Sequence, residues 1–266
     1  MKYLFVLLSL FCFSFLKAET DSSHYFISFD STRVYYEDKG SGDPVILLHG
    51  FLNTGQNWKR TAVYKDLLTA GYRVITPDLR GNGKSGKPHT DKAYSDDAEA
   101  KDIMALATLL RIKSYNIIGY SRGSIITARL LALDKRIRKA VMGGMGTDFT
   151  NPEWPRRKMF YHVLNGDTTV TELEPLIRRL QSDTALDRIA LTLQQKEQPS
   201  TSVAVLRRVK QPVLVICGRE DSDNGNAKAL SVLFKKGKFA TVPGDHGAAM
   251  GTKEFADNVL EFLKNN

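Results

Sequence analysis

Apolar and polar positions form a regular order of short and long segments along residues 19–146. Short apolar runs, such as Pro44–Leu48 and residues 115–119, predict strands that are buried on both faces. Between them, longer segments with apolar side chains three and four positions apart, such as residues 123–133, predict helices. This alternation indicates an α/β protein with a mostly parallel sheet that helices cover on both sides.

The pattern predicts eight strands in all. The first two, at residues 24–30 and 33–37, are separated by two residues only, so we expect an antiparallel hairpin. The other six strands are expected at residues 44–48, 72–76, 115–119, 140–144, 212–217 and 238–242. Helices are predicted at residues 58–69, 123–133, 227–234 and 253–263, with a further helix that Ser95 can cap.

The segment 147–209 breaks this alternation. It has helical patterns and basic side chains but no convincing core strand, and the sheet resumes after it at residue 212. We interpret it as a helical cap inserted after the sixth strand. Residues 19–146 and 210–266 then form one α/β domain, which is long enough to bury a sizeable core.

The first 18 residues have the layout of a secretory signal peptide. Lys2 supplies a positive start, residues 4–16 are almost wholly apolar, and Ala18 ends a plausible cleavage site. The apolar run is short for a membrane span, which needs roughly 20 residues. We therefore predict a secreted or periplasmic protein with no stable membrane span after cleavage. An uncleaved N-terminus that anchors the protein in a membrane is the alternative.

Charge and cysteine content narrow the function classes. The formal net charge is +9, and much of the excess lies in local clusters such as residues 156–158. No nucleic-acid-binding motif accompanies these clusters, so we expect no nucleic-acid partner, whereas attraction to anionic surfaces or acidic substrates is compatible with them. Removal of Cys12 with the signal peptide would leave Cys217 alone, which excludes an intramolecular disulfide.

The strongest chemical signal is the sequence Gly-Tyr-Ser-Arg-Gly at residues 119–123. It is a G-x-S-x-G pattern between a predicted strand and a predicted helix, which is the context of a nucleophile elbow. Small flanking residues allow a sharp turn there, which presents the Ser121 hydroxyl at the carboxyl end of the strand. An ordinary serine in a turn between strand and helix is the alternative, and it would need no catalytic partners.

A serine hydroxyl needs a base that takes its proton, and an acid that orients this base. Of the five histidines, His246 lies just past the last predicted strand, on the same rim of the sheet as Ser121. Asp221, after the seventh strand, is our preferred acid. Asp223 is its nearest substitute, and Asp148, after the sixth strand, is the more distant one.

An oxyanion hole needs two preorganised N–H donors. We expect one from the backbone of Arg122, the residue after the nucleophile. The other is expected from the turn that follows Leu48, where Phe51 is preferred and Leu52 is the alternative. His49, in the same turn, is expected to brace it rather than to transfer protons.

Taken together, these residues resemble the α/β-hydrolase superfamily over essentially the whole mature chain. The matching motifs are Leu-Leu-His-Gly-Phe at 47–51, Asp-Leu-Arg-Gly-Asn-Gly-Lys-Ser at 78–85 and the elbow at 119–123. The second of these looks like the D-x-R-G-x-G-x-S turn of many capped members, and residues 212–221 and 245–246 complete the pattern. The resemblance implies a capped, esterase-like serine hydrolase with no metal and no organic cofactor.

Two positions depart from the common forms of this family. Ser124 replaces a glycine that often follows the elbow, and Arg122 is less usual after the nucleophile. An arginine there resembles capped dehalogenases and epoxide hydrolases, but those enzymes use an aspartate nucleophile, so Ser121 argues against both activities. It favours esters, lactones, thioesters or amides that are cleaved through an acyl-enzyme.

We therefore expect a carboxylesterase-like enzyme whose partners are a small-molecule acyl substrate and water. A C–C bond hydrolase, an aminopeptidase-like amidase and a cofactor-free perhydrolase are alternatives that use the same triad. A non-catalytic α/β-hydrolase domain used for binding is the alternative from another class. It would have no need to keep Ser121, an acid and His246 together.

Apolar residues of the predicted cap are candidates for the acyl pocket, and they could equally form the core of the cap. These residues are Trp154, Phe160, Tyr161 and Leu164. Tyr94 and Met145 are weaker candidates for the same cleft.

Overall fold

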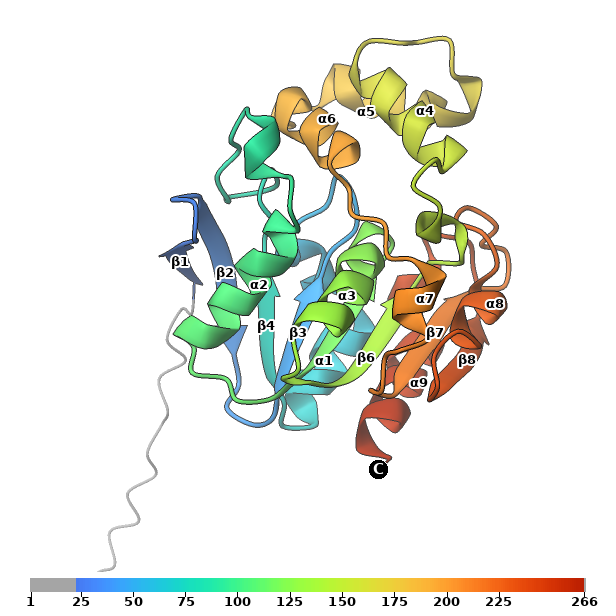
Figure 1. Ribbon diagram of the computed structural model, residues 1–266. Coiled ribbons are helices and arrows are strands. Elements are labelled where there is room, and N and C mark those ends of the chain that lie inside the picture. The colour runs from blue at the N-terminus through green and yellow to red at the C-terminus, as the bar shows by residue number, and fades with distance from the viewer. Residues whose placement is uncertain (1–22, 266) are drawn as a thin grey trace, which may run out of the picture.

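The computed structural model describes residues 23–265, which form an eight-stranded sheet flanked by helices (Figure 1). The strand order is β1-β2-β4-β3-β5-β6-β7-β8. The hairpin of β1 (Ser23–Ile27) and β2 (Arg33–Lys39) is antiparallel, and β2 is also antiparallel to β4 (Arg73–Pro77). All later pairs are parallel, which confirms the predicted fold class.

Two inner strands of the sheet are buried along their whole length. No residue of β5 (Tyr115–Tyr120) or β7 (Val213–Gly218) is exposed, as expected of strands that helices cover on both faces. The remaining strands are β3 (Pro44–Leu48), β6 (Ile137–Gly143) and the edge strand β8 (Gly237–Val242).

Helices pack on both faces of the sheet, and each face has its own apolar core. One core lies under α1 (Ala62–Thr69) and α9 (Lys253–Lys264). The other lies under α2 (Ala98–Leu109), α3 (Arg122–Leu133) and α8 (Ala227–Ser231). The helices on the two faces hold the strands in place, so the loops at the strand ends have fixed positions for functional groups.

Two predicted helices begin elsewhere than expected. The helix predicted at residues 58–69 is split into a 3-10 turn, Gly55–Arg60, and α1, because Thr61 is extended and its hydroxyl caps α1 by accepting from the Tyr64 N–H. Ser95 does not cap α2, which starts after Asp97 in a left-handed conformation. The Asp97 carboxylate binds Arg129 of α3 instead, so tertiary contacts set this start.

The segment between β6 and β7 is helical, and Figure 1 shows most of it above the sheet. Its long helices are α4 (Pro155–Leu164), α5 (Glu174–Ser182) and α6 (Arg188–Lys196), with short 3-10 turns at Asp148–Thr150 and Thr171–Leu173. The last helix, α7 (Val203–Leu206), returns to the domain, since Leu206 and Val209 belong to the core on the α3 side.

The predicted signal peptide, residues 1–18, lies outside the described residues, so export and the membrane-anchored alternative stay predictions. In the part from residue 23 to residue 265, no helix is long and apolar enough to cross a membrane. Cys217 lies in this part, where it is buried and unpaired.

The loop after β4 is built around Arg80, whose side chain is fully buried. Its guanidinium donates to both carboxylate oxygens of Asp102 on α2, at 2.7 and 2.6 Å, and to Asp30 beyond β1 at 2.6 Å. It also donates to the Ala93 carbonyl. One arginine therefore ties the loop at residues 78–85 to the first hairpin and to α2.

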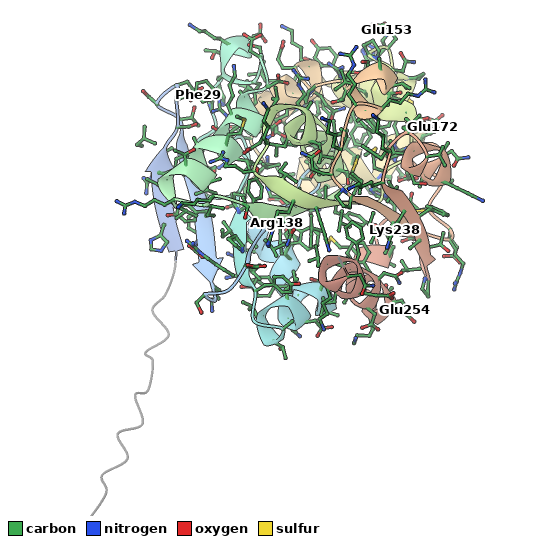
Figure 2. The ribbon with its side chains drawn as sticks, turned by 60° about the horizontal axis from the view of Figure 1, so that its bottom comes forward. Phe29, Arg138, Glu153, Glu172, Lys238 and Glu254 are labelled. Carbon is green, nitrogen blue, oxygen red and sulfur yellow. The ribbon has the colours of Figure 1, made fainter. Side chains whose placement is uncertain are left out.

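We expect Arg80→Met to lower the free energy of unfolding by about 3–5 kcal/mol, because it leaves Asp102 charged and buried without its partner. The measurement is a urea titration followed by circular dichroism. The matched control is Arg138→Met, which removes an exposed pair with Asp43 at the end of the molecule that faces the viewer in Figure 2. It should change stability by less than about 1 kcal/mol. Similar losses in the two variants would contradict the special role of Arg80.

Candidate active site

Ser121 occupies a strained turn between β5 and α3. Its backbone angles, φ 53° and ψ −121°, lie in a region that L-residues rarely adopt. A Cβ at position 119 would lie 2.2 Å from the Gly123 carbonyl oxygen, and one at position 123 would lie 2.3 Å from that of Leu48. The turn is therefore possible only with glycine on both sides, as in a nucleophile elbow.

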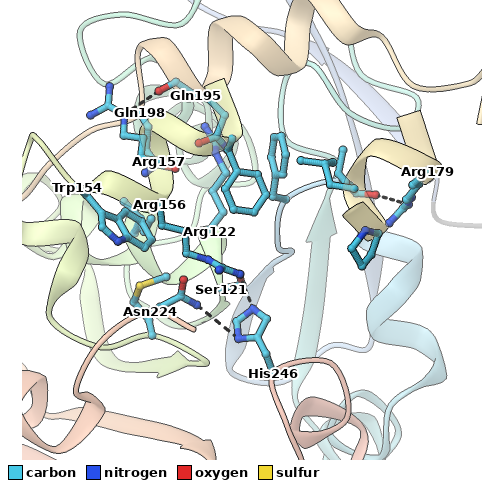
Figure 3. Close-up of a pocket in the computed structure, with 17 residues that line it drawn as sticks. Ser121, Arg122, Trp154, Arg156, Arg157, Arg179, Gln195, Gln198, Asn224 and His246 are labelled. Atoms are coloured by element: carbon cyan, nitrogen blue, oxygen red, sulfur yellow. Dashed lines mark hydrogen bonds between the residues drawn. The ribbon is translucent and has the colours of Figure 1, made fainter. Parts of the chain in front are cut away.

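The structure brings Ser121, His246 and Asp221 together. His246 follows β8, and its Nε2 lies 2.9 Å from Ser121 Oγ, the contact drawn in Figure 3. Its Nδ1 lies 2.9 Å from Asp221 Oδ2. The hydroxyl of Tyr120 donates to the His246 carbonyl at 2.7 Å, so the elbow also holds the histidine loop in place.

The carboxylate of Asp221 is almost fully buried beside the imidazole. Burial by itself would raise the pKa of Asp221, but the hydrogen bond and the charge of His246 outweigh it, and the pKa falls below its ordinary value. An N–H bond from Asp223 and the charge of Arg156 act in the same direction. Asp221 can therefore stay ionised and orient the imidazole.

The two substitutes considered for Asp221 have other partners. Asp223 binds Arg156 Nη2 at 2.9 Å, although a carboxylate oxygen of Asp223 lies within 4.8 Å of His246 and Asp221 ligand atoms. Asp148 lies against the backbone of Gly225. Within the described residues, Asp221, Asp223 and His246 form a group whose ligand atoms could suit a metal ion. Hydrogen bonds already join His246 to Asp221 and Asp223 to Arg156.

The turn after β3 runs directly against the nucleophile. A Cβ at Gly50 would lie 3.2 Å from Ser121 Cβ, and Phe51 and Leu52 line the same cavity as Ser121. Within residues 23–265, the backbone N–H groups of Phe51 and Arg122 make no hydrogen bond. The two predicted donors are therefore free to bind an oxyanion.

His49 holds this turn, as expected. Its Nε2 accepts from the Leu79 N–H at 3.0 Å, so the proton lies on Nδ1, which is 2.8 Å from the Gly50 carbonyl oxygen. Burial lowers the pKa of His49, which keeps the ring neutral. The loop that Arg80 anchors thus supports the oxyanion turn through His49.

The side chain of Arg122 is occupied elsewhere. It forms a two-pronged pair with Glu99 of α2, at 2.6 and 2.5 Å, and both side chains are almost fully buried. Its positive charge is therefore compensated by Glu99, although its buried Nε has no hydrogen-bond partner within the described residues.

A cavity of about 300 Å³ opens at Ser121 between the sheet and the helical segment (Figure 3). Apolar side chains form much of its wall, namely Phe51, Leu52, Ile125, Met145, Trp154, Phe160, Pro175 and Leu176. Polar side chains complete it, namely Arg156, Arg157, Arg179, Gln195, Gln198 and Asn224. The apolar part of this wall is suited to an apolar group such as an acyl chain.

Of the predicted pocket residues, Trp154, Phe160 and Met145 line this cavity and Tyr161 does not. Tyr161 follows Phe160 on α4, and one residue turns a helix by about 100°. It therefore lines a second hollow with Pro152 and Lys158, and this hollow shares Arg157 and Gln195 with the cavity.

Two further candidates are also excluded from the cavity. Leu164 is buried inside the helical segment, and Tyr94 is buried against Ala93 and Ala190. Sequence reasoning missed most of the polar lining. The sequence signal for this lining is the basic cluster at residues 156–158, which lies between the pocket candidates Trp154 and Phe160 along the chain.

A serine, a histidine and an aspartate at the carboxyl ends of a mostly parallel sheet define the hydrolase class of α/β proteins. The sequence matches the family model described as alpha/beta hydrolase fold over residues 43–176. The chain belongs to the α/β-hydrolase fold family.

Relatives within this family carry different activities. The chain is 35% identical to a non-heme chloroperoxidase of Streptomyces lividans over 117 residues, 42% of this chain and 41% of that one. The chain thus spans about two fifths of the length of this curated relative. A bromoperoxidase of Bacillus anthracis has a TM-score of 0.76 at 25% identity, covering 92% of this chain and 100% of that one. An esterase of Exiguobacterium antarcticum has a TM-score of 0.75 at 21% identity, with 91% and 99% covered, which shows the shared fold.

We expect Asp221→Asn to lower kcat by roughly 10³–10⁴-fold on an activated ester, because the amide cannot stabilise the charged imidazole. Asp223→Asn is the matched control and should cost less than about tenfold, since it removes only the pair with Arg156. Steady-state kinetics of both variants check this. Equal, mild losses would move the acid's role to another residue, with Asp148 tested next.

Proposed function

We propose that this protein is a serine hydrolase that cleaves a carboxylic ester of a small molecule through an acyl-enzyme. The observation that carries the proposal is the continuous set of contacts from Asp221 through His246 to Ser121, at the mouth of a largely apolar cavity. Lactones and thioesters are substrates of the same chemistry.

The first half of the reaction forms the acyl-enzyme. His246 Nε2 takes the proton of Ser121 Oγ while that oxygen attacks the substrate carbonyl. The backbone N–H groups of Phe51 and Arg122 hold the negative oxygen, and a donor of this kind contributes on the order of 3 kcal/mol. The C–O bond to the alcohol then breaks, and His246 gives its proton to the departing alcohol.

The second half releases the acid. His246 takes a proton from a water molecule, whose oxygen attacks the acyl carbon and forms a new C–O bond. The bond to Ser121 Oγ breaks, and the proton returns from His246 to that oxygen. One ester and one water are converted to one acid and one alcohol, and the free enzyme is restored.

A second candidate is perhydrolysis, which the likeness to the bromoperoxidase over 92% of this chain favours. Hydrogen peroxide would replace water in the second half, so that the acyl-enzyme is converted to a peroxy acid. Addition of peroxide to an ester assay should then yield peroxy acid, detected by oxidation of a dye. Release of the ordinary acid only, at every peroxide concentration, would exclude this candidate.

We expect a fluorophosphonate probe to label the mature protein at Ser121, because its hydroxyl is activated by His246. Mass spectrometry of the digested adduct locates the label. His246→Ala should abolish labelling while the protein stays folded by circular dichroism. A folded native protein that takes up no label would contradict the proposal and favour a binding protein.

A further inference from the structure

One end of the cavity is polar, and its side chains come from neighbouring parts of the helical segment. Arg156 and Arg157 lie on α4, Gln195 lies on α6, and Gln198 follows shortly after. Figure 3 shows these four side chains grouped near Trp154, on the side of the cavity away from Arg179. Such a group can recognise one end of a substrate.

Two of these side chains are buried and have no protein partner. Gln195 is 5% exposed and Gln198 is 7% exposed, and both line the cavity. In the part of the chain that the structure describes, neither side-chain amide makes a hydrogen bond. Neither amide is among the fully buried polar atoms that lack a partner, so both amides are accessible from the cavity that they line. An amide offers two N–H donors, which can bind a polar group that enters the cavity.

The charges around the cavity do not balance. None of its lining residues is an aspartate or a glutamate. Arg122 is neutralised by Glu99, and Arg156 is paired with Asp223. Arg157, by contrast, donates only to carbonyl oxygens: that of Gln195 at 2.8 Å, that of Lys196, and more weakly that of Pro152. Burial lowers the pKa of Arg157, while the charges of Glu197 and Glu153, which make no hydrogen bond with it, act in the opposite direction.

We propose that Arg157, Gln195 and Gln198 form a carboxylate-binding subsite, so that the substrate is an ester whose acyl part ends in a second, free carboxylate. Arg179 also lines the cavity without a carboxylate partner, but it lies on the opposite side and donates to the Leu52 carbonyl (Figure 3). At the Arg157 end, one guanidinium without a carboxylate hydrogen bond and two neutral amides suit a single negative charge, whereas a dianionic phosphate would keep an unbalanced charge. Trp154 and Ile125 share the cavity and give the connecting methylene groups an apolar surface. This inference rests on the proposed ester hydrolysis.

The kinetic test compares 4-nitrophenyl hydrogen adipate with 4-nitrophenyl hexanoate, which have acyl chains of equal carbon number. The native protein should show a kcat/KM about tenfold or more higher for the adipate. Gln198→Glu retains the size of the side chain and breaks none of the protein's hydrogen bonds, but it brings a like charge to the carboxylate. The adipate-to-hexanoate ratio should therefore fall about tenfold or more.

Two further variants make this test specific. Gln195→Glu carries the same charge on the neighbouring helix and replaces Gln198→Glu if the latter does not fold. Arg178→Gln is the matched control, because Arg178 is exposed, pairs with Glu174 and does not line the cavity. Its ratio should equal that of the native protein. A native ratio near one, or a ratio that the glutamate variants do not change, overturns the subsite.

Binding to Ser121→Ala separates the two proposals, because it needs no catalysis. Isothermal titration calorimetry should show adipate binding about tenfold or more tighter than hexanoate, with the difference lost in Ser121→Ala combined with Gln198→Glu. Selective adipate binding by a protein that hydrolyses neither ester would support the subsite and overturn the ester hydrolysis. Equal binding of the two acids overturns the subsite even if both esters are cleaved, as does tighter binding of 5-phosphonopentanoate than of adipate.

Discussion

The strained turn at Ser121 is the constraint on which the rest of the site depends. An L-residue at φ 53° is unfavourable unless its surroundings hold it, and here Gly119 and Gly123 pack so closely against neighbouring carbonyls that neither position can hold a side chain. A hydrogen bond of 2.8 Å from the Ser121 N–H to the Gly143 carbonyl ties the turn to β6. The same geometry exposes the hydroxyl to His246 and leaves the Arg122 N–H free, so strain and reactivity have one structural cause.

Buried charges around this turn fall into two kinds. Arg80 and Arg122 are buried and each is paired with a carboxylate, so they brace the loops that surround the nucleophile. Arg157 is half-buried at the cavity and meets carbonyl oxygens only. Since a matched buried pair orders the protein and an unmatched charge favours an anionic ligand, the first kind belongs to the scaffold and the second to recognition.

Proteins of the same fold carry names as different as chloroperoxidase, bromoperoxidase and esterase. A fold places a nucleophile and a base, but the wall of the cavity decides which molecule reaches them. In this chain more than half of the residues that line the cavity belong to the segment between β6 and β7, which includes α4, α5 and α6.

The sequence by itself determined the strands of the sheet, because apolar runs depend on neighbouring residues. It also placed Ser121, Asp221 and His246, because glycine spacing marks the turn at Ser121 and the other two residues follow predicted strands. It could not choose firmly between Asp221 and Asp223, which differ only in whether a side chain meets His246 or Arg156. It also misplaced Tyr161 and the start of α2. The sequence could not show that the amides of Gln195 and Gln198 lie at the cavity without a protein partner. Their surroundings form only when distant segments pack together, so the tertiary structure decided this feature.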